Sequence, residues 1–106
     1  MTRWSAVERD GVWSGLVETD AGAVSGWHHH GGHDTIAYVL SGELLVEFGP
    51  GGGEAVEVRP GDFLLVPAHT VHREGNPSGQ VGRAVVVRVG SGDVVVNVAG
   101  PDPVEG

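Results

Sequence analysis

Residues 22–42 read GAVSGWHHHGGHDTIAYVLSG, and residues 61–76 read GDFLLVPAHTVHREGN. Each stretch begins with glycine and combines histidines with a short apolar run, at residues 36–40 in the first and 63–66 in the second. Short apolar runs that are rich in strand-forming residues and bounded by glycine or proline predict buried β-strands rather than helices. The two stretches therefore predict strands that carry histidines near their ends.

Three adjacent histidines in the first stretch are separated into two groups by strand geometry. Side chains two residues apart on a strand point to the same side, with Cα atoms about 6.6 Å apart. His28 and His30 are therefore predicted to converge on one metal ion, while His29 faces away. A helical pairing of His29 with His33 is disfavoured, because two glycines lie between them. Imidazole ligands suit transition metals, so the expected cofactor is divalent iron, nickel, copper, zinc or manganese.

The composition extends the strand prediction to the whole chain. Twenty valines and nineteen glycines among 106 residues indicate many short strands joined by tight turns, and no helical periodicity longer than about one turn is present. The predicted fold class is all-β, a sandwich or barrel. The first ten residues are expected to be irregular or to form an edge strand. Further strands are predicted at residues 12–19, 36–40, 43–48, 55–58, 63–66, 83–89 and 93–98.

The two histidine-bearing stretches resemble the paired motifs of the cupin family. Gly22, His28, His30 and Gly42 match the spacing of its first motif, and Gly61, Pro67, His72 and Asn76 match its second motif. The resemblance implies a double-stranded β-helix (jelly roll) with His28, His30 and His72 binding metal inside the barrel. We therefore expect one cupin domain over residues 1–99, followed by a flexible tail at residues 100–106.

Two positions depart from the family pattern. The glycine of the second motif is replaced by His69, which predicts an altered bend and another imidazole near the pocket mouth. The glutamate of the first motif is replaced by Thr35, whose hydroxyl is a poor transition-metal ligand. His33 lies two residues before Thr35 and shares its side of an extended chain, so His33 is predicted as the fourth ligand. Asp34 points away by the same parity, and water in the open positions is the alternative to His33.

The charge pattern limits the classes of partner. The net charge is −8, and the six positive residues are scattered arginines, so nucleic acids and anionic membranes are not expected as partners. The chain has no cysteine, no signal-peptide pattern and no apolar run that could span a bilayer. These features predict a cytoplasmic protein. The strands at 83–89 and 93–98 are apolar at consecutive positions, which predicts that both faces are covered, and we expect a homodimer to provide one cover.

The expected function follows from the metal site and the pocket beside it. Parity places Ala37 and Val39 in the pocket, whereas Tyr38 packs elsewhere. Arg83 is expected to be solvated, the alternative being a clamp for a substrate carboxylate. We expect a metal-dependent dioxygenase that acts on a small organic substrate. The alternatives are a non-catalytic metal- or ligand-binding cupin and a Lewis-acid isomerase or cyclase.

Overall fold

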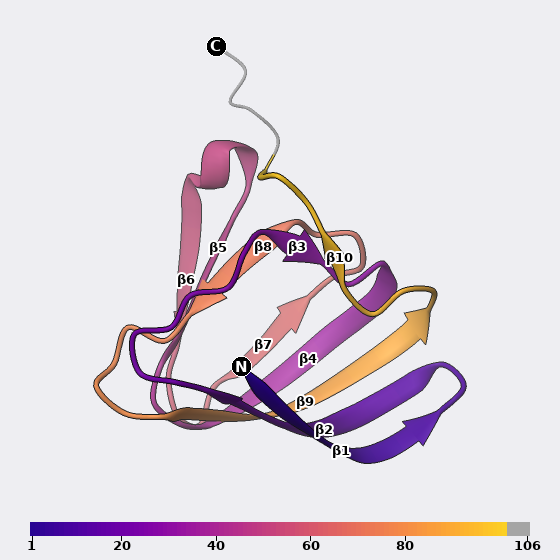
Figure 1. Ribbon diagram of the computed structural model, residues 1–106, viewed down its shortest axis with the longest axis horizontal. Helices are drawn as coiled ribbons and strands as arrows, with labels where there is room; N and C mark the ends of the chain where they lie inside the picture. Colours follow the sequence, from indigo (N-terminus) through magenta and orange to yellow (C-terminus); the bar gives the residue numbers. More distant parts are fainter. Residues whose placement is uncertain (102–106) are drawn as a thin grey trace.

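The computed structural model describes residues 1–101 of the chain, and almost all of its regular structure is β-strand (Figure 1). One short 3-10 helix, η1 (Pro50–Gly52), joins two of the strands. The strands are β1 (Thr2–Arg9), β2 (Val12–Thr19), β3 (His28–His29), β4 (Gly32–Ser41), β5 (Leu44–Phe48), β6 (Glu54–Val58), β7 (Phe63–Val66), β8 (His72–Gly75), β9 (Gly82–Ser91) and β10 (Val96–Asn97).

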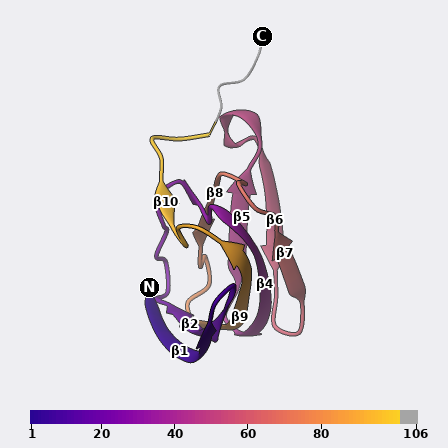
Figure 2. The ribbon, with the colours of Figure 1, turned by 90° about the vertical axis from the view of Figure 1, so that its right-hand side faces the viewer.

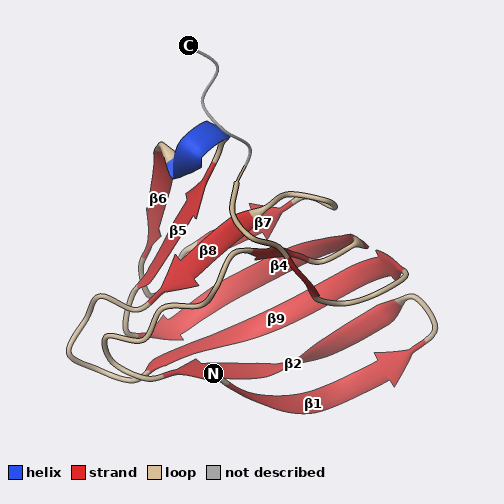
Figure 3. Ribbon diagram, turned by 45° about the horizontal axis from the view of Figure 1, so that its top comes forward, coloured by secondary structure: helices blue, strands red, loops and turns tan. Residues whose placement is uncertain are grey.

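The strands form two five-stranded antiparallel sheets. The first sheet has the order β1-β2-β9-β4-β7 and is seen strand by strand in Figure 3. The second has the order β10-β3-β8-β5-β6 and lies across the first sheet, in the upper part of Figure 1. In the side view, β10 and β7 lie at opposite sides of the molecule (Figure 2). The all-β jelly roll predicted from the sequence is confirmed.

Most strand predictions match the structure, and one is wrong. Strands 12–19 and 63–66 are found with the predicted bounds, and the first residues form the edge strand β1. The strand predicted at 93–98 shrinks to Val96–Asn97. Residues 93–95 are not part of this strand. The carbonyl oxygen of Val94 instead accepts a hydrogen bond from Nδ1 of His30 at 2.7 Å.

The interior of the barrel is both apolar and polar. Along β4, burial alternates from residue to residue, so that Thr35, Ala37 and Val39 point inward as predicted. Ala37 packs with Val17 and Val86 in the central apolar cluster. A second group of buried residues is polar: Thr19, His28, His30, His33, Thr35, His72, Asn76 and Arg88. An interior with this many buried polar side chains is suited to holding a ligand rather than to packing alone.

Two glycines of the paired motifs have clear backbone roles. Gly42 has φ +69°, and a Cβ there would lie 2.7 Å from the Cα of Gly82 in the neighbouring segment. Gly61 has φ +91°, the conformation that the third position of a type II turn after Pro60 requires. The motif spacing therefore reflects the two sharp turns that bring the histidine-bearing strands together.

Asn76, the last residue of the second motif, ties the two sheets together. Its side chain is almost fully buried, with 1 % exposure. Its amide nitrogen donates to the carbonyl oxygens of Thr19 at 3.2 Å and Gln80 at 2.6 Å, and its amide oxygen accepts from the hydroxyl of Ser78 at 2.7 Å. Asn76 therefore has a structural role and does not contact the histidine cluster described below.

The end of the chain falls largely outside the described residues. The tail predicted at 100–106 includes residues 102–106, which the structure does not describe. Within residues 1–101, no helix has both the length and the apolar character needed to cross a membrane.

Candidate metal centre

Three histidines from the two motifs meet inside the barrel. His28 lies on β3 and is paired in register with His72 on β8, and His30 follows directly after β3. One nitrogen from each ring lies within 4.8 Å of a nitrogen from each of the others. The ring centroids of His28 and His72 are 4.4 Å apart, and His30 is 5.0 Å from both. The chain therefore carries a buried group of three histidines that are close enough together to bind one metal ion.

The backbone orients all three rings in the same way. A carbonyl oxygen only accepts hydrogen bonds, so a ring nitrogen that bonds to it carries the proton. Nδ1 donates to a carbonyl oxygen in each case: His28 to Gly26 at 2.8 Å, His30 to Val94 at 2.7 Å and His72 to Thr70 at 2.8 Å. Each Nε2 is then the unprotonated nitrogen, with a lone pair free for a metal.

The Nε2 of His72 supports this assignment independently. It is buried and has no hydrogen-bond partner among the described residues. A buried polar nitrogen without a partner is costly, and a metal ion at this point would satisfy it. The three histidines thus fit a divalent transition metal.

Burial favours the neutral form of two of the three rings, those of His30 and His72. The pKa of His30 is lowered from 6.5 to about 3, mainly by burial, with smaller contributions from Arg88 and the other two histidines. Burial also lowers the pKa of His72, although its bond to Thr70 and the charge of Glu74 oppose the shift. Imidazole must be neutral to bind a metal. At neutral pH these rings therefore do not have to lose a proton before a metal binds.

The structure places His33 outside this group. His33 is buried on the inward face of β4, as predicted, but none of its ring nitrogens belongs to the three-histidine cluster. Its Nδ1 lies 3.2 Å from the carbonyl oxygen of His30, and it lines neither of the two cavities that reach the cluster. His33 as the fourth ligand stays a prediction. Asp34 points outward as predicted, and its Oδ1 accepts from the backbone N–H of Ala68 at 2.9 Å.

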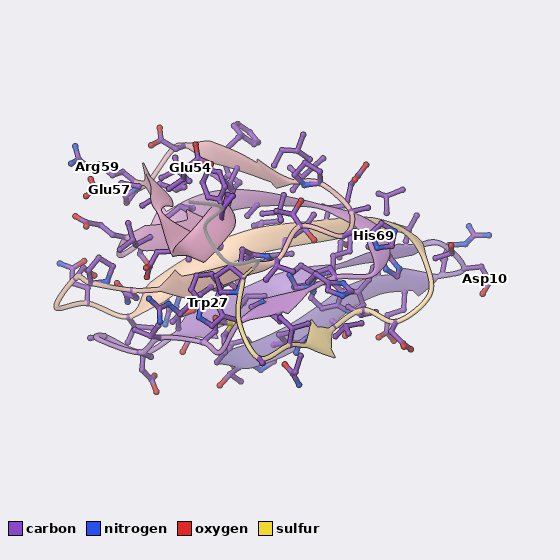
Figure 4. The ribbon with its side chains drawn as sticks, turned by 90° about the horizontal axis from the view of Figure 1, so that it is seen from above. Asp10, Trp27, Glu54, Glu57, Arg59 and His69 are labelled. Carbon is purple, nitrogen blue, oxygen red and sulfur yellow. The ribbon has the colours of Figure 1, made fainter. Side chains whose placement is uncertain are left out.

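His29 and His69 lie away from the cluster. Their rings are tilted against each other with centroids 6.0 Å apart, and His69 is exposed, on a different part of the surface from Trp27 (Figure 4). His69 has φ +60°, a left-handed conformation that glycine adopts readily and that strains a residue with a Cβ. The altered bend at His69 stays a prediction.

A carboxylate that was not predicted from the sequence lies next to the cluster. Glu74 lies two residues after His72 on β8, and its Oε1 is 3.7 Å from Nε2 of His28. Side chains two residues apart on a strand lie on the same side, as for His28 and His30, so Glu74 lies on the same side of β8 as His72. Applying that parity to the second motif would have identified it.

Arg83 is solvated as predicted, and the buried arginine of β9 is Arg88, which the sequence did not single out. Arg83 is exposed and its Nε donates to Glu18 at 3.1 Å, as expected for a solvated residue. Arg88, on the opposite face of the strand, is only 6 % exposed and lines the interior. Burial lowers the pKa of Arg88, the charge of Arg3 contributes in the same direction, and the charge of Glu74 opposes both. Strand parity separates Arg88 from Arg83, but no signal in the sequence indicates which of the two points inward.

Two cavities reach the histidines. The inner one, with a volume of about 50 Å³, is bordered by His30 and His72 and has apolar walls that include Val39 and Val86. The outer one, of about 210 Å³, is bordered by His28 and His30. Glu74 and Arg88 border both cavities. A small molecule bound here would therefore lie against the metal ligands, a carboxylate and an arginine.

Comparison with known proteins agrees with this architecture. The family model described as "Cupin domain" matches residues 15–88. The Bacillus subtilis protein YdbB is 45 % identical over 47 residues, a match that spans 44 % of this chain and 40 % of that relative. This chain thus matches less than half of the length of that curated relative.

Solved structures show the same fold over most of the chain. A double-stranded β-helix domain protein from Klebsiella pneumoniae superposes with a TM-score of 0.78 at 18 % identity, covering 92 % of this chain and 83 % of that one. A cupin superfamily protein from Desulfitobacterium hafniense gives 0.70 at 21 % identity, covering 85 % and 77 %. A protein from Thermus thermophilus gives 0.73 at 26 % identity, covering 85 % and 83 %.

Proposed function

The chain belongs to the cupin family, and from this membership and its three converging histidines we propose that it is a metal-dependent dioxygenase acting on a small organic molecule held in the barrel. The observation that carries the proposal is the common orientation of the rings, in which each Nδ1 donates to a backbone carbonyl and each Nε2 is left free. A neutral imidazole set of this kind suits iron and copper.

The residues around the cluster support a reaction rather than storage of an ion. The three histidines come from β3, the residue after it and β8, and the cavity beside them is also lined by residues of the other sheet, among them Thr35 and Val86. A redox-active metal with open positions brings a substrate and O₂ together. The apolar walls, among them Val17, Val39 and Val86, exclude water from that space. A dioxygenase adds both oxygen atoms to its substrate and so needs no external reductant.

We further propose that Glu74 provides the carboxylate that Thr35 lacks. Like His33, Glu74 is not part of the three-histidine group. Its Oε1 is nevertheless 3.7 Å from the Nε2 of His28, and Glu74 borders both cavities that reach the cluster, which His33 does not. A set of histidines with one carboxylate and open positions is characteristic of non-heme iron oxygenases. Comparing Glu74→Gln with His33→Asn tests this choice of fourth ligand. Weaker metal binding in Glu74→Gln alone supports Glu74, and weaker binding in His33→Asn alone supports His33.

The function is tested by metal analysis followed by O₂ uptake. Protein purified without chelators is expected to contain iron or copper and to consume O₂ with a catechol or a β-diketone. Zinc or nickel without O₂ uptake would favour an isomerase or cyclase. A bound metal without any reaction would favour a non-catalytic binding protein. Absence of any bound metal would overturn both the dioxygenase and the isomerase or cyclase.

The ligand assignment is tested by substitution of one histidine. His72→Ala removes a buried Nε2 that no described residue satisfies, and metal affinity is expected to fall by more than the roughly 10–100-fold typical of an outer-shell residue. His29→Ala is the matched control, since His29 is adjacent in sequence to two of the ligands but faces away. Titration of the metal-free variants with the metal measures both. Equal affinities in the two variants would contradict the site.

A further inference from the structure

Arg88 is a buried arginine whose guanidinium has no counter-charge in contact. It is 6 % exposed, and its Nε and Nη1 donate no hydrogen bond to any described residue. The ion pairs found within residues 1–101 do not include it. A buried charge without a partner is strongly unfavourable. The position is therefore explained best by an anion that binds from outside the chain.

The surroundings hold the guanidinium plane in place. Its Cζ lies 5.1 Å from the ring centroid of Trp13 on β2, so the aromatic ring supports the cation. Arg88 is also paired in register with Thr35 on β4, and the hydroxyl of Thr35 is buried without a hydrogen-bond partner. Two donors that no described residue satisfies thus lie next to each other on the wall of the cavity.

The protein's own carboxylate lies near Arg88 but does not form an ion pair with it. Glu74 borders the same cavities and its charge raises the pKa of Arg88, but its closest described ionic contact is the ring of His28, at 3.7 Å. Thr35, the strand partner of Arg88, is uncharged and provides no counter-ion. A carboxylate from a ligand would provide one, and a guanidinium binds a carboxylate with two parallel hydrogen bonds.

We propose that Arg88 and Thr35 form a carboxylate-binding site and that the substrate of this cupin is a small organic acid. The acid's carboxylate binds to the two donors, while its short apolar body lies against the valines and faces the histidines. The inner cavity of about 50 Å³ holds only a small molecule. Naming this substrate class rests on the proposed function, whereas the carboxylate site itself needs no metal.

The test measures binding of propionate to the metal-free protein in the presence of a chelator, by calorimetry. Propionamide, which has nearly the same shape but no charge, is the matched ligand control. Propionate is expected to bind at least ten times more tightly than propionamide. Arg88→Gln is expected to abolish this preference. Arg59→Gln, which changes an exposed arginine that borders neither of the two cavities, is expected to keep it.

A measurement on the unsubstituted chain covers the case in which Arg88→Gln does not fold. The Nε–H resonance of Arg88 in the NMR spectrum is expected to shift with propionate and not with propionamide. Equal binding of the two ligands, or an Nε–H resonance that propionate leaves unchanged, would overturn the carboxylate site. These measurements are made without metal, so their outcome is independent of the proposed function. The carboxylate site can be overturned while metal binding and O₂ uptake are confirmed, and it can be confirmed while they are not.

Discussion

At the scale of single residues, burial of His30 makes the metal-free protein sensitive to acid. The folded protein holds the pKa of His30 at about 3, against 6.5 for an ordinary histidine. Between these values the unfolded chain binds a proton that the folded chain does not, so stability decreases as the pH falls from about 6.5 toward 3. The stabilising effect of the neutral ring is complete above pH 6.5, and burial of His72 acts in the same direction.

The prediction is checked by urea unfolding in the presence of a chelator at several pH values between 7 and 4. The unsubstituted chain is expected to lose stability steadily over this range. His30→Gln keeps a polar side chain that does not titrate, and its stability is expected to fall less steeply. Identical slopes for the two proteins would show that His30 is not the group responsible.

At His69 the backbone conformation itself lowers the stability of the folded protein. Its φ of +60° places a side chain with a Cβ in a region that strains residues other than glycine by about 1–2 kcal/mol. A hydrogen bond stabilises this turn: the backbone N–H of His69 donates to the carbonyl oxygen of Gly31 at 2.9 Å. That bond connects the turn after β7 to the segment that carries the metal ligands.

At the scale of elements, the turn between β7 and β8 is expected to be improved by glycine. His69→Gly removes the backbone strain in the folded protein. The greater conformational entropy of glycine in the unfolded chain offsets part of the resulting gain in stability. We expect a net stabilisation of about 0.5–1 kcal/mol, measured by urea unfolding. His69→Ala retains a Cβ and is expected to give no gain. A stabilisation of the same size in His69→Ala would show that backbone strain is not the cause.

The two faces of β9 show how far element-level reasoning extends. Strand parity correctly separates Arg83 from Arg88, which lie on opposite faces. Parity does not say which face points inward, because valines occupy both faces of this strand. Only its pairing with β2 and β4, whose inward faces carry Val17 and Ala37, decides that Arg88 is buried.

At the scale of the whole molecule, the metal is expected to stabilise the fold. A ligand that binds only the folded state adds about 2.7 kcal/mol at a concentration 100 times its dissociation constant. For a domain of about 100 residues this raises Tm by roughly 10–20 °C. Thermal unfolding before and after chelation measures the effect. His72→Ala is expected to show little change on chelation, and an equally large change in that variant would contradict the role of His72.

The sequence by itself determined the jelly roll and the three histidines, because both follow from local rules. Glycine and proline at regular spacing specify the turns, valine-rich runs specify the strands, and alternation puts His28 and His30 on one side. The motif spacing then added His72. Parity along β4 likewise predicted that Thr35, Ala37 and Val39 point inward.

The tertiary structure decided which further residues surround the site. Glu74 and Arg88 border the same cavities because antiparallel pairing brings β8 next to β3 and β9 next to β4. The tertiary structure also places His33 outside the three-histidine cluster, although its side chain is buried and lies on the inward face of β4. The direction of a side chain is a property of its own strand. The distance between two side chains on different strands depends on sheet register, which no local pattern in this sequence specifies.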